Sequence, residues 1–585
     1  MSINEFHRNI ILTIFIAIIC LFVGLYIIFV FTRLLPVDPV ASYLAARGIH
    51  NPAEGAYQQM KCQLGFCDSI TVQYFKYISD FFTGNWRISV SLYSGTKVTD
   101  IFGETIPKTL GLISLPLIIG GGFGFFLGRI SSRNRGTGKD KIIQVFSILG
   151  ISLPIFFLCG IFQYALCYEL KICEPTGISA LPIEILTFTL TAFITWQVRS
   201  YLTNKSYEKS LLLNTIKTGI SFSYIFMFWL LVEVTFNIYG FGTILIYAIS
   251  QYDYFLIRGS LFLIIIMFVI VTISSNLIFS IYMSRRSKSF EYNTEPKFDD
   301  TTDKGENSIE SNPEENIKEF LRRRLKSPFF ILGAILIIFF IFIAIFPQLM
   351  TQYSLSETLN PSSDLWNPPS SEHPLGQTVS GLDVYALIIW GIHDSIIVGF
   401  LAVLIGLIGG SIFGFIAGKF NRWGYRIIMG LMIFFYIFPG IVLVILLIDS
   451  SLLFYGPFYW YGSLFIGILL IPNFTRVIAN AISGEINIHK ISKAVISQIP
   501  LNFAIFIVIY TTVGFLGLYT LYSVLELQNQ PIQLGSIVNM GSQILPDAPW
   551  ASFWPGLTIF GIVLSFLLFH VGLQDYQSKN RIKIE

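Results

Sequence analysis

The chain has 585 residues, of which 54% are hydrophobic and only 12% are charged, and its mean hydropathy is +0.67. Soluble domains carry about 25% charged residues, so this composition excludes an array of soluble domains and places most of the chain in lipid. The net charge of +3 is too small to indicate a nucleic-acid-binding protein.

Long apolar runs predict the membrane spans. A spanning helix needs roughly 20 apolar residues, because each residue rises about 1.5 Å through a hydrocarbon core of about 30 Å. The first run is too long for a signal-peptide core and no small-residue cleavage site follows it, so we expect a retained anchor. The twelve predicted spans lie near residues 10–32, 108–130, 142–167, 180–198, 216–236, 259–283, 327–348, 395–418, 426–448, 461–475, 499–521 and 555–573.

Basic residues give the predicted spans an orientation. Lys and Arg concentrate in cytoplasmic loops of membrane proteins, and the outer loops 349–394, 449–460 and 522–554 contain neither residue when the N-terminus is placed inside. The sequence therefore predicts cytoplasmic termini and a multi-pass protein of the cytoplasmic (inner) membrane. The basic residues of the predicted inner loops are Arg133, Arg135, Lys139, Lys141, Arg199, Lys205, Lys209, Arg285, Arg286, Lys288, Lys419, Arg422, Arg426, Arg476, Lys490, Lys493, Lys579, Arg581 and Lys583.

A polar stretch at 284–326 divides the chain into two halves. Between Glu291 and Glu319 there are ten acidic residues against three lysines, and such a segment cannot bury a core, so we expect a flexible cytosolic linker. The halves 1–283 and 327–585 each contain six spans in the same orientation. Parallel repeats of this kind are a transporter architecture whose pathway lies at the repeat interface.

Proline, cysteine and ionisable residues supply further candidates. Each half has a proline inside its third span, Pro154 and Pro439, which kinks a gate or is merely packed. Cys62 and Cys67 lie in a predicted outer segment, where they form a disulfide or remain free thiols. His570 lies within the last predicted span, where it has a functional role or, as a neutral side chain, hydrogen-bonds a neighbouring helix. Neither the six cysteines nor the six histidines show metal-ligand spacing, so no metal site is expected.

Three motifs of the first half occur in the order known from one family of membrane proteins. Leu35-Pro36-Val37-Asp38-Pro39-Val40 is similar to that family's LPGDPV, and Ser152-Leu153-Pro154-Ile155-Phe156 to its SIPxF. Glu233-Val234-Thr235-Phe236-Asn237, followed by Gly240-Phe241-Gly242, resembles its fifth-span signature. On these motifs the first half resembles the B-type permease of oligopeptide, dipeptide and nickel ABC importers. Glu233 either lines the pathway or caps local structure.

The second half resembles the C-type partner of the same family. His373-Pro374-Leu375-Gly376-Gln377-Thr378 with Gly381-Leu382-Asp383-Val384 is similar to its HPLGTDxxGRDV, with Leu382 in place of Arg. Val513-Gly514-Phe515-Leu516-Gly517 resembles LSFLGLG, and Phe553-Trp554-Pro555-Gly556-Leu557 matches the approach to the last span. Asp383 orders an outer loop or contacts substrate.

The resemblance implies an all-α, type I ABC importer permease of about twelve transmembrane helices, with the B-type and C-type subunits fused. Its partners would be cytosolic ABC ATPases, an extracytoplasmic solute-binding protein and a peptide or similar small solute. The implied pathway or gate residues are Pro154, Glu233, Gly240, Gly242, Pro439, Phe515 and Gly517. The implied ATPase-coupling residues, in short loops near 199–217 and 476–500, are Tyr207, Glu208, Lys209, His489, Lys490 and Lys493.

The chain has no sequence for binding the nucleotide itself. Gly138-Lys139 is followed by Asp140, and Gly418-Lys419 by Phe420, so neither pair completes a Walker A loop. We therefore expect a transport permease that is not an enzyme and holds no cofactor, with ATP bound on partner subunits. Two alternatives are an ion-coupled secondary transporter and a membrane scaffold that has lost ATPase coupling.

Overall fold

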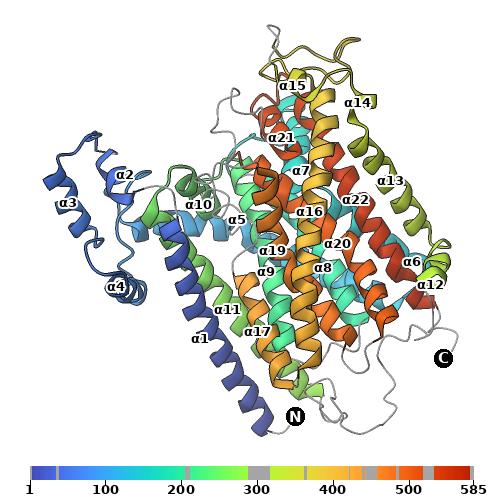
Figure 1. Cartoon of the computed structure of the whole chain (residues 1–585), viewed down its shortest axis with the longest axis horizontal. Helices are drawn as coiled ribbons and strands as arrows, with labels where there is room; N and C mark the ends of the chain where they lie inside the picture. The colour runs from blue at the N-terminus through green and yellow to red at the C-terminus, as the bar shows by residue number, and fades with distance from the viewer. Residues whose placement is uncertain are drawn as a thin grey trace. The chain divides into compact units, whose positions relative to one another are not determined.

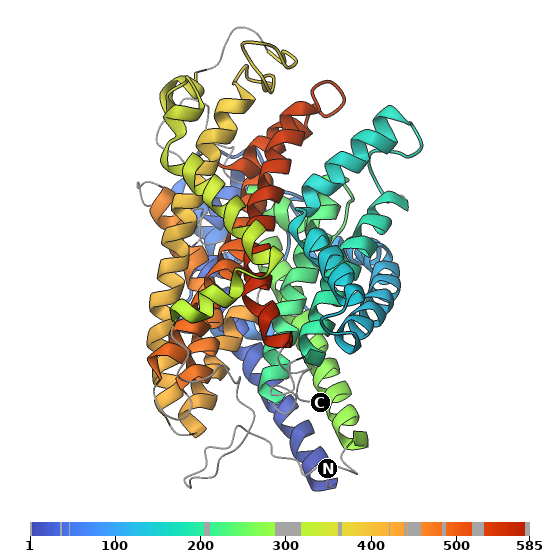
Figure 2. The same cartoon turned by 90° about the vertical axis from the view of Figure 1, so that its right-hand side faces the viewer.

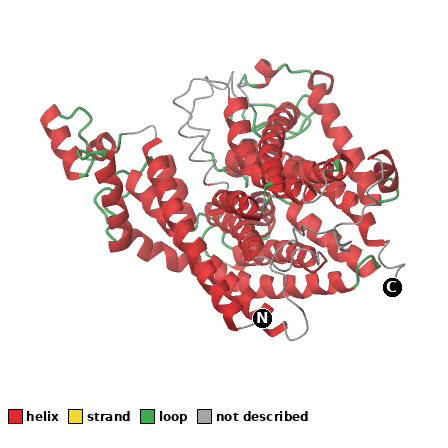
Figure 3. Ribbon diagram, turned by 60° about the horizontal axis from the view of Figure 1, so that its bottom comes forward, coloured by secondary structure: helices red, strands yellow, loops and turns green. Residues whose placement is uncertain are grey.

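The computed structural model describes residues 3–34, 38–45, 47–178, 180–203, 211–286, 317–360, 365–420, 422–437, 442, 458–482, 487–517 and 532–579. These residues form helices and two isolated β-bridges, with no strand among them (Figure 3). The predicted all-α class is therefore confirmed. Most of the predicted linker lies outside the described residues, as do the predicted site residues Tyr207, Glu208, Lys209 and Pro439.

The described residues group into two compact units. Unit 1 comprises Met1–Ile113, Leu211–Tyr292 and Ile433–Tyr455, and α1 packs against α11 within it (Figure 1). Its helices are α1 (Ile3–Leu34), α2 (Pro39–Ala45), α3 (Glu54–Gln63), α4 (Ile70–Thr83), the first part of α5 (Val98–Arg133), α9 (Leu211–Thr235), α10 (Phe241–Ser250) and α11 (Tyr254–Arg286).

Unit 2 comprises Ser114–Ser210, Asn293–Met432 and Gly456–Glu585. Within it α16 lies along α19, and α13 lies against α22 (Figures 1 and 2). Its helices, with the rest of α5, are α6 (Gly138–Ser152), α7 (Ile155–Phe162), the π-helix η1 (Gln163–Glu169), α8 (Ala180–Thr203), α12 (Ile317–Arg324), α13 (Pro328–Ile345), α14 (Pro347–Met350), α15 (Leu355–Thr358), α16 (Val384–Lys419), α17 (Arg422–Ile437, which ends in unit 1), α19 (Phe458–Ile482), α20 (Ile488–Phe515), α21 (Leu534–Ser542) and α22 (Trp550–Lys579).

Ten described helices are long and apolar enough to cross a membrane, and one bent helix pair is an eleventh candidate. Each of the ten overlaps a predicted span, because an apolar run in lipid can satisfy its backbone groups only as a helix. The helices that begin at Val98, Val384 and Ile488 start about ten residues before the predicted spans. The predicted span 142–167 corresponds to the bent pair, in which α6 and the run from Ile155 to Glu169 meet at 88°. The predicted span 426–448 begins in α17, and most of its second half lies outside the described residues.

Glycines set the closest helix packing in unit 2. A Cβ atom built on Gly124 of α5 would lie 2.9 Å from the carbonyl oxygen of Thr191 in α8. One built on Gly410 of α16 would lie 2.3 Å from Cβ of Phe474 in α19. The second and fourth spans of both halves thus pack through glycine, which allows membrane helices to approach closely. Unit 2 contains helices from both sides of the linker, and the division into halves at residues 284–326 stays a prediction.

Two disulfides each tie the end of a helix to the segment that follows it. Cys62–Cys67 joins α3 to the next turn and is one of the two alternatives that the sequence left open. Cys167–Cys173 joins η1 to the segment before α8 and was missed because its spacing has no motif. Cys20 and Cys159 are buried free thiols.

We expect the four paired cysteines to resist alkylation until a reductant is added, and Cys20 and Cys159 to react only after unfolding. Replacing Cys167 by serine should lower the free energy of unfolding by about 2 kcal/mol, from the loop-closure entropy of so short a ring. Mass spectrometry with two isotopic alkylating reagents, used before and after reduction, measures the pairing. Alkylation of Cys173 in the unreduced native chain would contradict it.

Candidate translocation site

The helix break at Pro154 shapes the candidate site. Pro154 is the N-cap of α7, and Leu153 before it has extended backbone angles, φ −70° and ψ 116°. Proline lacks an N–H and disfavours helical geometry in the preceding residue. The chain therefore leaves α6 at Ser152 and begins α7 in a new direction, 88° away. The change of direction at Pro154 is larger than a kink, and its role as a gate residue stays a prediction.

The two phenylalanines after this break contact the second half of the sequence. The ring of Phe156 stacks on that of Phe515 with centroids 4.5 Å apart and planes inclined by 12°. The ring of Phe157 lies 6.0 Å from that of Phe553 in α22. A Cβ atom on Gly556 would lie 2.0 Å from Cδ2 of Phe157, so only glycine leaves room for this ring. All of these residues belong to unit 2.

Hydrogen bonds from α21 hold Phe515 at the C-terminal end of α20. Phe515 is 4% exposed, and its carbonyl oxygen accepts a hydrogen bond from Nδ2 of Asn539 in α21. Ser536 donates from its hydroxyl to the carbonyl oxygen of Gly514 at 3.2 Å. Gly517 follows with φ +71°, a left-handed conformation that favours glycine. The predicted residues Phe515 and Gly517 are therefore parts of one turn that α21 braces.

These contacts bring two predicted residues, Pro154 and Phe515, to one place through Phe156. Phe156, Phe157, Phe553 and Gly556 were not among the predicted site residues. Phe156, Phe553 and Gly556 stood inside the motifs at 152–156 and 553–557, and Phe157 directly follows the first motif, so a signal was present. Their pairing was not, because about 360 residues separate Phe156 from Phe515 along the chain.

Glu233, Gly240 and Gly242 form a separate group in unit 1. The Glu233 side chain is fully buried, and its Oε1 accepts the hydroxyl hydrogen of Thr109 at 2.5 Å. Its Oε2 accepts the backbone N–H of Gly242 at 2.6 Å and that of Thr243 at 3.3 Å. These donors are the free amides at the N-terminus of α10, where a negative charge is favourable. The contacts match the capping interpretation of Glu233.

Close approach to this carboxylate explains both glycines of the group. A Cβ atom on Gly240 would lie 2.3 Å from Oε1 of Glu233, and one on Gly242 would lie 2.9 Å from Oε2. Any side chain there would displace the carboxylate from the α10 amides. Gly240 and Gly242 thus serve the cap that Glu233 forms.

The predicted coupling residues of the second half lie at the start of α20. Asn487 caps this helix by accepting the backbone N–H of Lys490 at 3.1 Å. His489 is exposed and Lys490 is half-buried. Lys493 is buried, with Nζ 6.0 Å from the ring centre of Phe320 in α12. Lys493 therefore lies inside the packing of α12 on α20 and does not contribute a surface group.

The remaining ionisable candidates have structural partners. Nδ1 of His570 lies 2.7 Å from the carbonyl oxygen of Ser497 in α20, which confirms a histidine hydrogen-bonded to a neighbouring helix. Asp383 caps α16 by accepting the N–H of Ala386 at 2.6 Å, and its Oδ2 lies 2.7 Å from Nδ1 of His373. Among the described residues, no group of three or more His, Cys, Asp or Glu side chains could hold a metal ion.

The chain is similar to known transport permeases, although no family model matches it. The dipeptide transport system permease protein DppC of Alkalihalophilus pseudofirmus is 31% identical over 280 residues, 44% of this chain and 88% of the relative. The glutathione transport system permease protein GsiD of Pectobacterium atrosepticum is 27% identical over 280 residues, 44% of this chain and 89% of the relative.

A second kind of relative matches as well. The dipeptide transport system permease protein DppB of Lactococcus lactis is 29% identical over 146 residues, 24% of this chain and 48% of the relative. The C-type relatives are thus matched along most of their length and the B-type relative along about half. The chain therefore belongs to the family of peptide-transport permeases of ABC importers, with B-type and C-type permease sequences joined in one multi-pass membrane protein.

Proposed function

We propose that this chain forms, by itself, the complete membrane pathway through which an ABC importer moves short peptides into the cytoplasm. The observation that carries the proposal is that one polypeptide matches both a DppC and a DppB permease, proteins named for dipeptide transport. Separate cytosolic ATPases bind ATP and supply the energy, and an extracytoplasmic solute-binding protein delivers the peptide. The chain itself holds no cofactor.

The charge pattern supports the proposed orientation, with both termini in the cytoplasm. The predicted outer loops 349–394, 449–460 and 522–554 contain no Lys or Arg, as expected for extracytoplasmic loops. Cys62–Cys67 lies in a predicted outer segment, and Cys167–Cys173 joins the outer end of the predicted span 142–167 to the outer loop after it. Disulfides persist on the oxidising side of the membrane.

Reconstitution in liposomes tests this function. The purified chain is combined with candidate ABC ATPases and a candidate solute-binding protein from the same organism, and uptake of radiolabelled dipeptides and tripeptides is followed with and without ATP. We expect uptake that requires ATP and stops when the ATPase active site is inactivated. Uptake that ignores ATP and follows an imposed proton gradient would favour a secondary transporter. Failure of any ATPase to copurify would favour a scaffold.

In this proposal the Phe156–Phe515 and Phe157–Phe553 contacts close the outer part of the pathway. Each pair joins a side chain of the first half to one of the second half, and the pathway of a parallel repeat lies at that interface. With the N-terminus inside, α20 ends and α22 begins on the outer side. Separation of the two halves would break both contacts together, as an outer gate requires.

Phe515→Ala is expected to weaken this gate. An aromatic pair contributes about 0.5–1.5 kcal/mol beyond its buried area, which corresponds to a shift of about 2- to 12-fold in a closed-to-open equilibrium. We expect ATP hydrolysis without peptide to rise by a similar factor while transport per ATP falls. Hydrolysis and uptake measured on the same liposomes give both quantities.

Phe400→Ala, which removes a ring from a residue of α16 that is 63% exposed, is the control and should change neither rate. The double variant Phe156→Ala/Phe515→Ala should be no worse than the stronger single variant if the two rings act on each other. Fully additive effects of the two substitutions would contradict a shared contact.

A further inference from the structure

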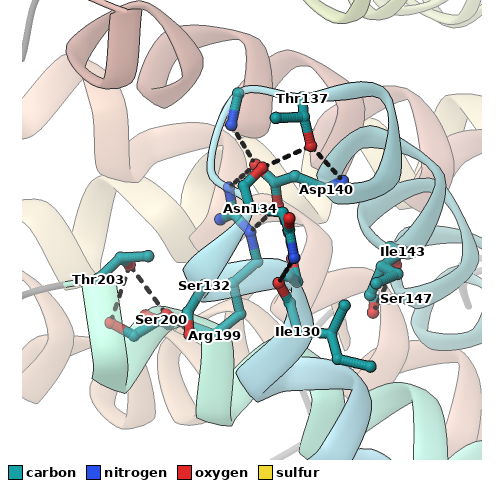
Figure 4. A network of polar contacts seen from close by, with 12 residues as sticks. Ile130, Ser132, Asn134, Thr137, Asp140, Ile143, Ser147, Arg199, Ser200 and Thr203 are labelled. Atoms are coloured by element: carbon teal, nitrogen blue, oxygen red, sulfur yellow. Dashed lines mark hydrogen bonds and ion pairs between the residues drawn. The ribbon is translucent and has the colours of Figure 1, made fainter. Parts of the chain in front are cut away.

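We propose that the ion pair between the buried Asp140 and the partly buried Arg199 is a positioning device that transmits movement of the end of α8 to the Pro154 break. Arg199 Nε donates to Oδ1 of Asp140 at 2.8 Å, and its Nη2 donates to Oδ2 at 3.1 Å (Figure 4). The inference rests on the proposed function, since it assigns a role in coupling to residues outside the gate.

The carboxylate of Asp140 joins three elements at one point. Besides Arg199 of α8, it accepts the hydroxyl hydrogen of Ser131 in α5 at 2.5 Å and the backbone N–H of Gly136 in the α5–α6 turn at 2.9 Å. Asp140 itself lies in the first turn of α6 and is 1% exposed. The end of α5, the start of α6 and the end of α8 are therefore tied to a single side chain (Figure 4).

Arg199 lies near the C-terminal end of α8, shortly before the predicted coupling residues in the sequence. It lies in the last turns of α8, which ends at Thr203, and the predicted coupling residues 207–209 follow within a few positions. In the proposed function, force from an ATPase subunit on the cytoplasmic side acts on the end of α8. The bidentate guanidinium–carboxylate geometry fixes orientation as well as distance, which a single lysine ammonium cannot do.

The three helices behind the ion pair are packed to move together. A Cβ atom on Gly128 of α5 would lie 2.8 Å from the carbonyl oxygen of Thr195 in α8. One on Gly150 of α6 would lie 2.4 Å from Cβ of Ala192 in α8. Backbones this close leave little room for sliding. The ion pair joins the helices of this block at the end where α8 finishes, near Thr203.

The far end of the same block leads to the proposed gate. α6 ends at Ser152, two residues before Pro154, and α7 then carries Phe156 onto Phe515. A displacement of α8 that α6 shares would therefore reach the break and the aromatic contact beyond it. Without the ion pair, the end of α8 could move while the start of α6 stayed in place.

The second half has a weaker contact in the corresponding position. Near the start of α17 and the end of α19, Tyr425 donates from its hydroxyl to Oδ1 of Asn480 at 3.2 Å. This hydrogen bond joins two neutral groups and is less directional than the bidentate pair. Tyr425→Phe therefore supplies a matched control for the loss of a polar contact beside the other coupling loop.

The test uses the full complex of this chain with its ATPases and binding protein. Arg199→Lys keeps the positive charge and removes the guanidinium group, whose two N–H donors bind both oxygens of Asp140. We expect this variant to retain ATPase binding and basal hydrolysis within about twofold of the parent, while stimulation of hydrolysis by binding protein and peptide falls about tenfold. Tyr425→Phe should stay within about twofold of the parent in all three measurements. Unchanged stimulation in Arg199→Lys would overturn the proposal.

Hydrogen exchange gives a readout that does not depend on transport. In the parent complex, a non-hydrolysable ATP analogue should change exchange both at the end of α8 and in residues 150–158. In Arg199→Lys the change in exchange should be confined to the end of α8 and should not extend to residues 150–158. If it still reaches residues 150–158, or if the variant loses ATPase binding and thermal stability together, the ion pair has only a structural role.

A parent complex without ATP-dependent uptake refutes the proposed function itself. If instead the parent complex transports peptide and Arg199→Lys is stimulated equally well, the proposed function stands and only the role of the ion pair is refuted.

Discussion

Gly410→Ala is expected to destabilise unit 2 by forcing α16 away from α19. The new Cβ atom would lie 2.3 Å from Cβ of Phe474 and 3.0 Å from both the carbonyl oxygen of Ile471 and the amide nitrogen of Thr475. Since two of these atoms are backbone, rotation of one side chain cannot relieve the contact, and the two helices must separate.

Overpacking of this kind costs about 1–3 kcal/mol, against a gain of up to about 1 kcal/mol in helix propensity when glycine becomes alanine. We expect a fall in the thermal midpoint of the purified protein and less folded material in the membrane. Gly430→Ala in α17 is the control, because its Cβ atom would meet no heavy atom within 4 Å. It gains the same propensity without the clash, and its midpoint should stay level or rise.

The same pair of substitutions is available in the first half. Gly124→Ala in α5 would place Cβ 2.8 Å from Cβ of Ile194, whereas Gly122→Ala on the same helix meets nothing within 4 Å. The expected order of thermal midpoints is therefore Gly122→Ala above Gly124→Ala. Equal midpoints in both pairs would show that the helices are not packed as described.

Glu233→Ala is expected to lower the free energy of unfolding by about 3 kcal/mol or more. The substitution leaves the N–H groups of Gly242 and Thr243 and the hydroxyl of Thr109 without the acceptor that they share. Each buried polar group that loses its partner costs about 1–3 kcal/mol, and the removed side chain leaves a cavity beside α10. Denaturation of the purified protein in detergent by sodium dodecyl sulfate measures the difference.

Glu233→Gln separates charge from shape. Its amide oxygen still accepts from the α10 amides, but it loses the charge that favours a helix N-terminus, so an intermediate loss is expected. Glu104→Gln, at an exposed position of α5, is the control and should be neutral. If Glu233→Ala keeps its stability and loses peptide uptake alone, the carboxylate lines the pathway instead of capping α10.

Interactions between neighbouring residues made the membrane spans and the break at Pro154 predictable. Apolar runs of about 20 residues can satisfy their backbone in lipid only as helices, so the candidate spans follow from hydropathy. Pro154 marked a break because its ring and missing N–H act on the residues beside it. A buried histidine in an apolar span needs a partner, and Ser497 supplies one to His570.

The pairings between distant residues were beyond the sequence. Phe156 and Phe515 stand in separate motifs, and neither motif indicates that one ring stacks on the other. In the sequence, Asp140 was noted only as the residue after Gly138-Lys139. Its pairing with Arg199 was not predictable, because the two residues are 59 positions apart. The choice between a pathway and a capping role for Glu233 likewise depended on the distance from its carboxylate to the amides of α10.

By itself, the sequence determined that the chain is a helical membrane permease, where its spans lie and where one of them breaks, because hydropathy and proline act over neighbouring residues. Only the tertiary structure decided the 88° turn at Pro154, the aromatic contacts between the two halves, and the junction at Asp140. These features depend on packing between segments that are distant in the sequence. They also depend on glycines that leave room for the backbone or side chains of a neighbouring helix.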